Sequence, residues 1–508
     1  MKMVVLARNL RHIQSVEFAC VNDTQLQLLV QGLPDRFGDT VEDPNTVCTN
    51  LRRIAIYNLA IERLELMSRP LVTLLNHNTR LTRLHIPCEL FGVDEVLAAV
   101  SKLWNLQHLA VYAVELFSTI QNPFLVLQSC LALPELTELM FSRHIEMDWV
   151  HGDAMAVKIK LEAIIAEATR SRFSHPTAKR IKWLQLPGDS MRQWDPLPLL
   201  LLKSKLLDLE TCEIPSFHED TTTQEIQDVI RMHCPNLKHL ICPGFLNNDQ
   251  DVEAAQAFIR GCSSLQSFTS AFFRDGPDHR PRLILSELME HHHATLEALE
   301  LLTPKQLFSR DLQDVLSQCK QLKRFWVVSE HGEGSLSGIA FRDISRSDWV
   351  CTELRELGVT FNRCRSGKDS LGGLGEEEVQ DDPHVWLTAS ATMRAFQQIG
   401  RLNKLEILEI DIDRSSRTKA KEQDYAWDLT LCKGWLGEWA DLKNLRSLRL
   451  RADFWSCMSQ EDVEFMHEHW PLLDEIIISS NISEFQTKQH WQWLREKRPH
   501  LRLEGMKR

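Results

Sequence analysis

Histidine and cysteine side chains that could bind a metal gather at two points of the chain. His233, Cys234, His239 and Cys242 offer the imidazole and thiol ligands that zinc prefers, and residues 291–293 offer three consecutive imidazoles. Because adjacent residues on a helix point in different directions, we expect a solvated helix end for the histidine run. The first cluster coincides with repeat positions, for which we expect packing. The sequence therefore predicts no metal site and no bound cofactor.

Motifs that would carry catalysis are missing from the sequence. It contains no glycine-rich phosphate loop, no nucleophile elbow and no HExxH segment. We therefore predict that the protein is not an enzyme and has no catalytic residues. A hydrolase or metal enzyme that uses the histidine-rich points stays as an alternative, and metal analysis of the purified protein tests it.

The cysteines belong to a recurring unit in which Cys stands three residues before a Leu that opens an apolar pattern. The copies read CTNLRRI, CPNLKHL, CSSLQSF, CKQLKRF and CTELREL, and they begin at Cys48, Cys234, Cys262, Cys319 and Cys351. In other copies the same position is held by Leu103, Leu133, Leu402, Leu442 and Trp470. This exchange of Cys for large apolar residues favours packing over chemistry.

Further copies follow if the cysteine is not required. Copies with apolar residues three and five positions after the first leucine begin at Leu51, Leu81, Leu106, Leu136, Leu237, Leu265, Leu296, Leu322, Leu354, Leu405, Leu445 and Leu473, although the Leu265 copy has Ser270 at its last position. Ile181 begins another, Ser204 a degenerate one and Ile13 an earlier one. The mean spacing is about 32 residues, near the roughly 20 to 29 residues of leucine-rich repeats.

Each unit predicts one strand and one helix. Alternation of apolar and polar residues over 84–86 has the period of a strand with one buried face. Helical spacing, as in Ile226, Val229 and Met232, lies between strands. Strands joined by helices run parallel and stack in one sense. We therefore predict an α/β fold: a right-handed leucine-rich-repeat solenoid (horseshoe), with a parallel concave sheet, convex helices and about 14 irregular repeats in one domain, 1–508.

The CxxLxxLxL unit resembles the repeat of ribonuclease-inhibitor-like folds, and especially the repeat region of fungal F-box proteins. The segments DWVCTELREL (348–357) and QQIGRLNKLEILEI (397–410) are similar to recurring segments of that family. The resemblance implies substrate recognition for a cullin-type ubiquitin ligase, with a Skp-type subunit as a partner. No F-box fits in the dozen residues before the first repeat, so we expect either an F-box upstream or repeats that act alone. The Asn expected nine positions into a repeat is absent from most copies, so we expect no regular asparagine ladder.

Two long intervals interrupt the repeat. The interval from Leu354 to Leu405 contains the Gly-rich, acidic segment 363–383, for which we expect a mobile surface loop. The interval from Leu136 to Ile181 predicts a longer convex helix. Its apolar members are Val157, Ile159, Leu161, Ile164 and Ile165.

Composition favours a cytoplasmic protein, with the nucleus as a second location. No apolar stretch approaches the roughly 20 residues that span a membrane, and no signal peptide is recognisable. The odd number of cysteines, 13, fits free thiols in a reducing compartment. The net charge of −12 argues against a nucleic-acid partner, although basic residues gather at Arg52, Arg53, Arg80 and Arg83.

If the fourth and sixth repeat positions point inward, the third, fifth and seventh point to the hollow face. Trp, Tyr and Arg dominate interface hot spots, and two of the chain's three tyrosines map to this face. The predicted protein-binding residues are Arg53, Tyr57, Arg83, His85, His108, Tyr112, Trp183, Arg324, Trp326, Glu409, Asp411, Arg449 and Arg451.

The sequence thus predicts a non-enzymatic protein-binding scaffold whose partner lies on the concave face. Membranes and nucleic acids are not among the expected partners. Two roles stay open. The first is substrate recognition for a ubiquitin ligase, and the second is a free-standing regulator that binds one protein target, as ribonuclease-inhibitor-like repeats do.

Overall fold

The computed structural model describes the greater part of the repeat region. The described residues are 14–19, 51–57, 64–113, 118–142, 145–149, 154–186, 197–214, 221–242, 249–271, 280–302, 309–328, 338–344, 347–362, 389–412, 431, 436–450, 458–478 and 489–505. The chain divides into two compact units, residues 1–240 with 260–263 and residues 241–259 with 264–508. We describe each unit by itself, so a single uninterrupted domain stays a prediction.

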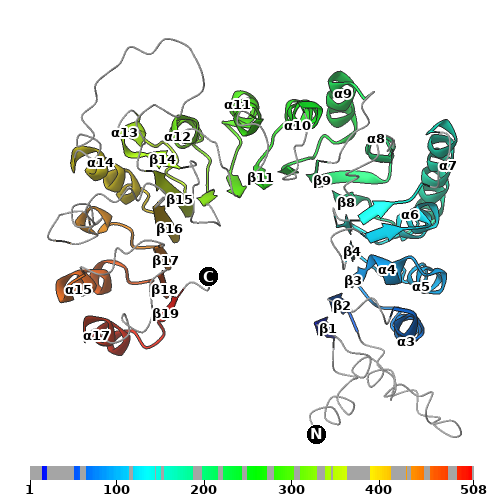
Figure 1. Ribbon diagram of the computed structural model, residues 1–508, viewed down its shortest axis with the longest axis horizontal. Coiled ribbons are helices and arrows are strands. Elements are labelled where there is room, and N and C mark those ends of the chain that lie inside the picture. Colours follow the sequence, from blue (N-terminus) through cyan, green and yellow to red (C-terminus); the bar gives the residue numbers. More distant parts are fainter. Residues whose placement is uncertain are drawn as a thin grey trace, which may run out of the picture. The chain divides into compact units, whose positions relative to one another are not determined.

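In the first unit each main strand pairs in parallel with the next (Figure 1). The strands are β1 (Ser15–Ala19), β2 (Arg53–Tyr57), β3 (Arg83–Pro87), β4 (His108–Tyr112), β6 (Glu138–Phe141), β8 (Ile181–Gln185) and β9 (Leu207–Glu213). Strands β5 (Ser118–Ile120) and β7 (Ile145–Met147) form a separate parallel pair. The helices of this unit are α3 (Leu64–His77), α4 (Cys88–Phe91), α5 (Asp94–Val100), α6 (Pro123–Leu131), α7 (Ala154–Phe173), α8 (Leu197–Leu202) and α9 (Thr223–His233).

The second unit repeats this arrangement, again with parallel pairing throughout. Its strands are β11 (Ser267–Ala271), β12 (Ala298–Leu302), β13 (Arg324–Val328), β14 (Ile339–Ala340), β15 (Glu356–Asn362), β16 (Ile407–Ile412), β17 (Ser447–Leu450), β18 (Glu475–Ile478) and β19 (Arg502–Gly505). Its helices are α11 (Arg280–His292), α12 (Ser309–Gln318), α13 (Phe341–Ile344), α14 (Ala389–Gly400), the 3-10 helix η5 (Leu436–Trp439), α15 (Gln460–His469) and α17 (Gln489–Lys497). The division between the units falls within β10 (His239–Cys242) and α10 (Asp249–Gly261).

This architecture confirms the predicted α/β leucine-rich-repeat fold. Within each unit the helices line one side of the strands, and the other side of the sheet carries no helix among the described residues (Figure 1). The copies that begin at Ile13, Ile181 and Ser204 supply β1, β8 and β9, as predicted. One further copy was missed, because Leu501 opens the strand β19.

Buried and more exposed side chains alternate along each strand and produce the two faces of the sheet. In β3, Leu84 and Ile86 are fully buried against the helices, whereas His85 between them is only partly buried. In β12, Leu299 and Leu301 are at most 1% exposed. Because strand side chains alternate, the residues between these leucines form the helix-free face of the sheet.

The predicted helices are present, with two corrections to their buried faces. Helix α9 contains the predicted Ile226 and Val229, both 2% exposed, but Met232 is 67% exposed and does not pack. Helix α7 accounts for the long interval after Leu136, as predicted. Its Ile159 is 59% exposed, so that residue does not belong to the apolar face assigned to it. None of the described helices is both long and apolar enough to cross a membrane.

Four of the five repeated cysteines are packing residues, as predicted, and the fifth, Cys48, lies outside the described residues. Cys234, Cys262, Cys319 and Cys351 are at most 6% exposed, and none is in a disulfide. Burial raises the pKa of the Cys234, Cys319 and Cys351 thiols to about 12, so each is a neutral group at physiological pH. Cys234 and Cys319 directly follow the ends of α9 and α12.

Polar side chains hold the same helix-end position in two other repeats and connect successive repeats there. Asn78 accepts from the Leu51 backbone N–H at 3.2 Å and donates to the Leu74 carbonyl at 2.8 Å. Arg498 donates to the carbonyl oxygens of Trp470 at 2.7 Å and His467 at 2.5 Å. The last carbonyls of a helix have no partner within it, so these buried side chains satisfy groups that would otherwise be orphaned.

His292 and Arg172 also connect successive repeats, although each stands earlier in its helix than the position that Asn78 and Arg498 hold. His292 Nε2–H donates to the Ile259 carbonyl at 2.8 Å, and the Leu265 N–H approaches His292 Nδ1 at 3.4 Å. Burial lowers the pKa of His292, which suits a neutral ring with one donor and one acceptor. Arg172, fully buried, donates through Nε to the Lys179 carbonyl at 2.7 Å. Such bridges connect repeats that lack a regular asparagine ladder.

Candidate functional site

The strand register of the first unit aligns the predicted binding residues in rows. One row crosses five neighbouring strands and contains Arg53, Arg83, His108, Glu138 and Trp183 in that order. Adjacent strands lie roughly 4.8 Å apart, so the row extends over roughly 19 Å. We call the outward residues of these strands the tyrosine–histidine face; its members are Arg53, Tyr57, Arg83, His85, His108, Tyr112, Glu138 and Trp183.

Four rings of this face touch one another. The His85 and His108 rings stack with centroids 4.7 Å apart, and the Tyr57 hydroxyl lies 3.2 Å from His85 Nδ1. The Tyr57 and Tyr112 rings are 5.7 Å apart, and the Tyr112 hydroxyl donates to the Ile56 carbonyl. Residues predicted separately from three repeats therefore form one continuous aromatic surface.

Burial and positive charge determine protonation on this face. Burial is the largest cause that lowers the pKa of His85, to about 4, and the neighbouring His108, Arg53 and Arg83 lower it further. His85 is therefore neutral at physiological pH. Burial also raises the pKa of the Tyr112 phenol, which stays protonated. The net charge of the face comes from its two arginines and from the pair of His108 and Glu138.

Polar atoms on the same face are buried without hydrogen-bond partners. They are Nε of Arg53, Nε2 of His108 and Nε1 of Trp183. His108 uses its other nitrogen, Nδ1, to contact the Glu138 carboxylate. A buried polar group without a partner costs roughly 1–3 kcal/mol, so these three groups lower the stability of the face.

The corresponding face of the second unit is organised differently, because its charges pair with one another. Arg324 lies 2.5 Å from Glu300 and 3.1 Å from Glu356, on the two flanking strands. Its guanidinium also lies 5.9 Å from the Trp326 ring centroid. Trp326 in turn covers Gly358, where an added Cβ would stand 2.7 Å from the Trp326 ring. The glycine is needed for this close approach.

A second set of pairs continues across β16 to β19. Arg449 lies 3.7 Å from Glu409 and 3.3 Å from Glu475, and the Ser447 hydroxyl donates to Glu475 at 2.7 Å. Burial opposes the charge of Glu475, but the Ser447 hydrogen bond together with Arg449 and Arg502 holds its pKa below the ordinary value. We call the two sets together the charged ladder; its members are Glu300, Arg324, Trp326, Glu356, Glu409, Ser447, Arg449, Glu475 and Arg502.

The remaining predicted residues have three outcomes. Asp411 lies on β16 and is partly buried, whereas Glu409 is only 2% exposed and its carboxylate is enclosed. Arg451 and the acidic segment 363–383 lie outside the described residues. The residues that the prediction omitted, above all Glu138 and Glu475, occupy the same third repeat position as His108. The spacing rule that selected His108 would have found them.

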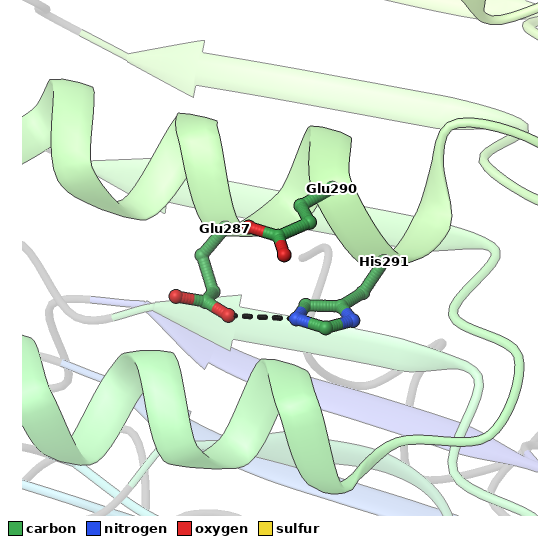
Figure 2. Close-up of side chains that lie close together, drawn as sticks. All are labelled: Glu287, Glu290 and His291. Carbon is green, nitrogen blue, oxygen red and sulfur yellow. Dashed lines mark ion pairs between the residues drawn. The ribbon is translucent and has the colours of Figure 1, made fainter.

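The alternative of a metal enzyme requires the consecutive histidines to share one set of metal ligands, and they do not. The run 291–293 separates: His292 bridges backbone groups, His293 contacts the Met289 carbonyl at 2.9 Å, and His291 lies 2.9 Å from Glu287. Figure 2 shows Glu287, Glu290 and His291 gathered along α11. In the part of the chain that the structure describes, no other group brings three ligand atoms within 4.8 Å of one another. This group lies at the surface and already contains an ion pair.

The Cys and His residues near β10 are distributed by the repeat. Cys234 and Cys242 are buried, at 2% and 0% exposed, and His233 and His239 face solvent. Burial raises the thiol pKa of Cys234, which disfavours the thiolate that a metal needs. These cysteines therefore serve the core.

Comparisons with known proteins assign no family. No family model matches the chain, and no curated protein matches it. Among solved structures, the chain is similar to one in the crystal structure of the yeast Rad7 and Elc1 complex. That alignment has a TM-score of 0.36 and 14% identity and covers 99% of this chain and 86% of that chain. A TM-score this low assigns neither fold nor function.

Proposed function

We propose that the protein is a non-enzymatic protein-binding scaffold and that its partner binds the tyrosine–histidine face. The observation that carries this proposal is the pair Arg53 and Arg83. They stand opposite each other on β2 and β3, and neither forms an ion pair with any residue that the structure describes. Tyr, Trp and Arg are the side chains that contribute most to interface affinity, and this face presents all three types.

A capture experiment tests the assignment of the face. Full-length protein is immobilised, and bound proteins are compared between wild type, Tyr57→Ala/Trp183→Ala and a matched pair on the charged ladder, Arg324→Ala/Trp326→Ala. The proposal predicts that a partner bound by wild type is lost from the first variant and retained by the second. Loss from the ladder pair alone would place binding on the second unit and contradict the proposal.

The finer role extends this proposal to substrate recognition for a cullin-type ubiquitin ligase. Its support is the resemblance of the repeat segments to those of fungal F-box proteins. A pull-down with a purified Skp-type subunit tests this role, and direct binding is the expected result. If the Skp-type subunit does not bind while partner capture persists, the free-standing regulator is the correct role.

Location and the lack of catalysis are part of the same proposal. All eight described cysteines are buried and none is in a disulfide, which suits a cytoplasmic or nuclear protein. Imaging of a tagged full-length chain tests the location. Metal analysis of the purified protein addresses the alternative of a metal enzyme, because a stoichiometric transition metal would revive it.

A further inference from the structure

The row of Arg53, Arg83, His108, Glu138 and Trp183 has the properties of an anion-binding surface. Arg53 and Arg83 are paired in the strand register, so two like charges lie on adjacent strands. Like charges on neighbouring strands repel. The Glu138 carboxylate, the acid in this row, contacts His108. Among the residues that the structure describes, the row therefore keeps uncompensated positive charge at the β2–β3 end.

Independent observations support this excess of positive charge. Both arginines contribute to lowering the pKa of the neighbouring His85. Nε of Arg53 and Nε1 of Trp183 also lack a partner, but both atoms are buried and a ligand on the surface does not reach them. An oxyanion is the natural partner of a planar guanidinium fork. The chemistry of the row therefore comes from the two guanidinium groups.

We propose that this row binds an acidic segment of the protein partner, with Asp or Glu carboxylates on Arg53 and Arg83. This inference rests on the proposed function and adds the chemistry of the partner. The row extends over roughly 19 Å from β2 to β8, and an extended chain covers roughly 3.3 Å per residue, so about six residues are enough to cross it.

The overall charge makes the site selective. The chain carries a net charge of −12, so it repels polyanions in general, and an acidic segment would bind only where positive charge is locally uncompensated. The charged ladder offers no such place, because Arg324 and Arg449 each lie between two carboxylates. Nucleic acid is the competing class of polyanion, and the experiment includes it.

Fluorescence anisotropy with the full-length protein tests the inference. The probes are labelled octaglutamate, octaglutamine and an oligothymidylate of eight nucleotides, and the variants are Arg53→Gln/Arg83→Gln and, as the matched control, Arg324→Gln/Arg449→Gln. We expect octaglutamate to bind wild type and the control, and to bind the first variant at least tenfold more weakly, equivalent to roughly 1.4 kcal/mol. Hydrogen exchange of β2 to β4 and of β13 to β18 verifies that both variants are folded.

A second variant separates a binding role from a structural one. Arg53→Lys/Arg83→Lys keeps both positive charges but removes the guanidinium forks, so octaglutamate binding should weaken about threefold, less than in the glutamine variant, while β2 to β4 stay protected from exchange. Equal binding of octaglutamine, tighter binding of the oligothymidylate, or equal loss in both arginine variants would each overturn the inference. If these peptides fail but partner capture still depends on Tyr57 and Trp183, the proposed function stands and only the acidic chemistry is wrong.

Discussion

The two units present the same kind of strand face but treat charge in opposite ways. On the charged ladder, Arg449 lies within 4 Å of both Glu409 and Glu475. On the tyrosine–histidine face, Arg53 and Arg83 stand side by side without a described carboxylate partner. Because the charged groups of the ladder pair with one another, they are poorly available to a charged ligand. The unpaired cations of the tyrosine–histidine face are the basis of its proposed binding role.

The largest expected effect is on the ladder. Arg449→Ala removes the cation 3.7 Å from Glu409, whose side chain is only 2% exposed. Losing one partner of an enclosed pair destabilises the other, here by about 2 kcal/mol. Hydrogen exchange of β16 to β18 in the full-length protein measures this.

The matched control for that variant is Arg355→Ala. Its 58%-exposed side chain pairs with Glu406 at 3.6 Å, so we expect a change within about 0.5 kcal/mol. Equal effects of the two substitutions would show that enclosure of the ladder does not matter.

The substitution Gly358→Ala tests how closely Trp326 of the charged ladder packs on the neighbouring strand. Gly358→Ala places a Cβ 2.7 Å from the Trp326 ring, which must shift to make room. We expect a loss of about 1–2 kcal/mol in the stability of the second unit. Thermal unfolding compared with Gly437→Ala measures it, because a Cβ at Gly437 meets nothing within 4 Å. A neutral Gly358→Ala would contradict the close packing of Trp326.

Acid should affect the two faces at different pH values. The pKa of His85 is about 4 in the folded protein and 6.5 in the unfolded chain, so the unfolded chain binds more protons between these values and stability falls as pH drops from 6.5 toward 4. The pKa of Glu475 is lowered, so its contribution is lost only as pH falls below its ordinary value of 4.5.

Exchange measured from pH 7 to 4.5 should therefore show β2 to β4 losing protection before β17 and β18. His85→Gln should flatten the response of β2 to β4 and leave the ladder unchanged. Simultaneous loss on both faces would mean that His85 does not determine the acid response of the first unit.

The smallest expected effect has the opposite sign to that of Arg449→Ala. Arg53→Gln/Arg83→Gln removes two like charges that have no described ion-pair partner, so the stability of the first unit should stay equal or rise by up to about 0.5 kcal/mol. Thermal unfolding of the variant beside wild type measures this. A clear loss of stability would mean that these arginines are structural and that the contrast between the faces is wrong.

The sequence predicts the fold well because the repeat is a local signal. Alternation such as Leu84, His85 and Ile86 defines a strand and its outward residue without knowledge of any neighbour. The helix-end bridges could also have been found, since Asn78 and Arg498 stand three residues before a repeat leucine, where other copies have cysteine.

The sequence alone does not predict which charged residues form ion pairs. Arg449 and Glu475 are 26 residues apart, and only the strand register brings them within 3.3 Å. Arg53 and Arg83 follow the same repeat rule as Arg324 and Arg449, so the sequence nominated all four alike. Which arginines meet carboxylates depends on the residues that the register places on the adjacent strands.

Arginine-selective modification followed by mass spectrometry tests the central claim most directly. Full-length protein is treated with phenylglyoxal, alone and with octaglutamate, and the modification rates of Arg53, Arg83, Arg324 and Arg449 are compared. The account predicts fast modification at Arg53 and Arg83 that octaglutamate suppresses, and slow modification at the two ion-paired ladder arginines that octaglutamate does not change. Equal rates at all four arginines, or protection confined to Arg324 and Arg449, would contradict it.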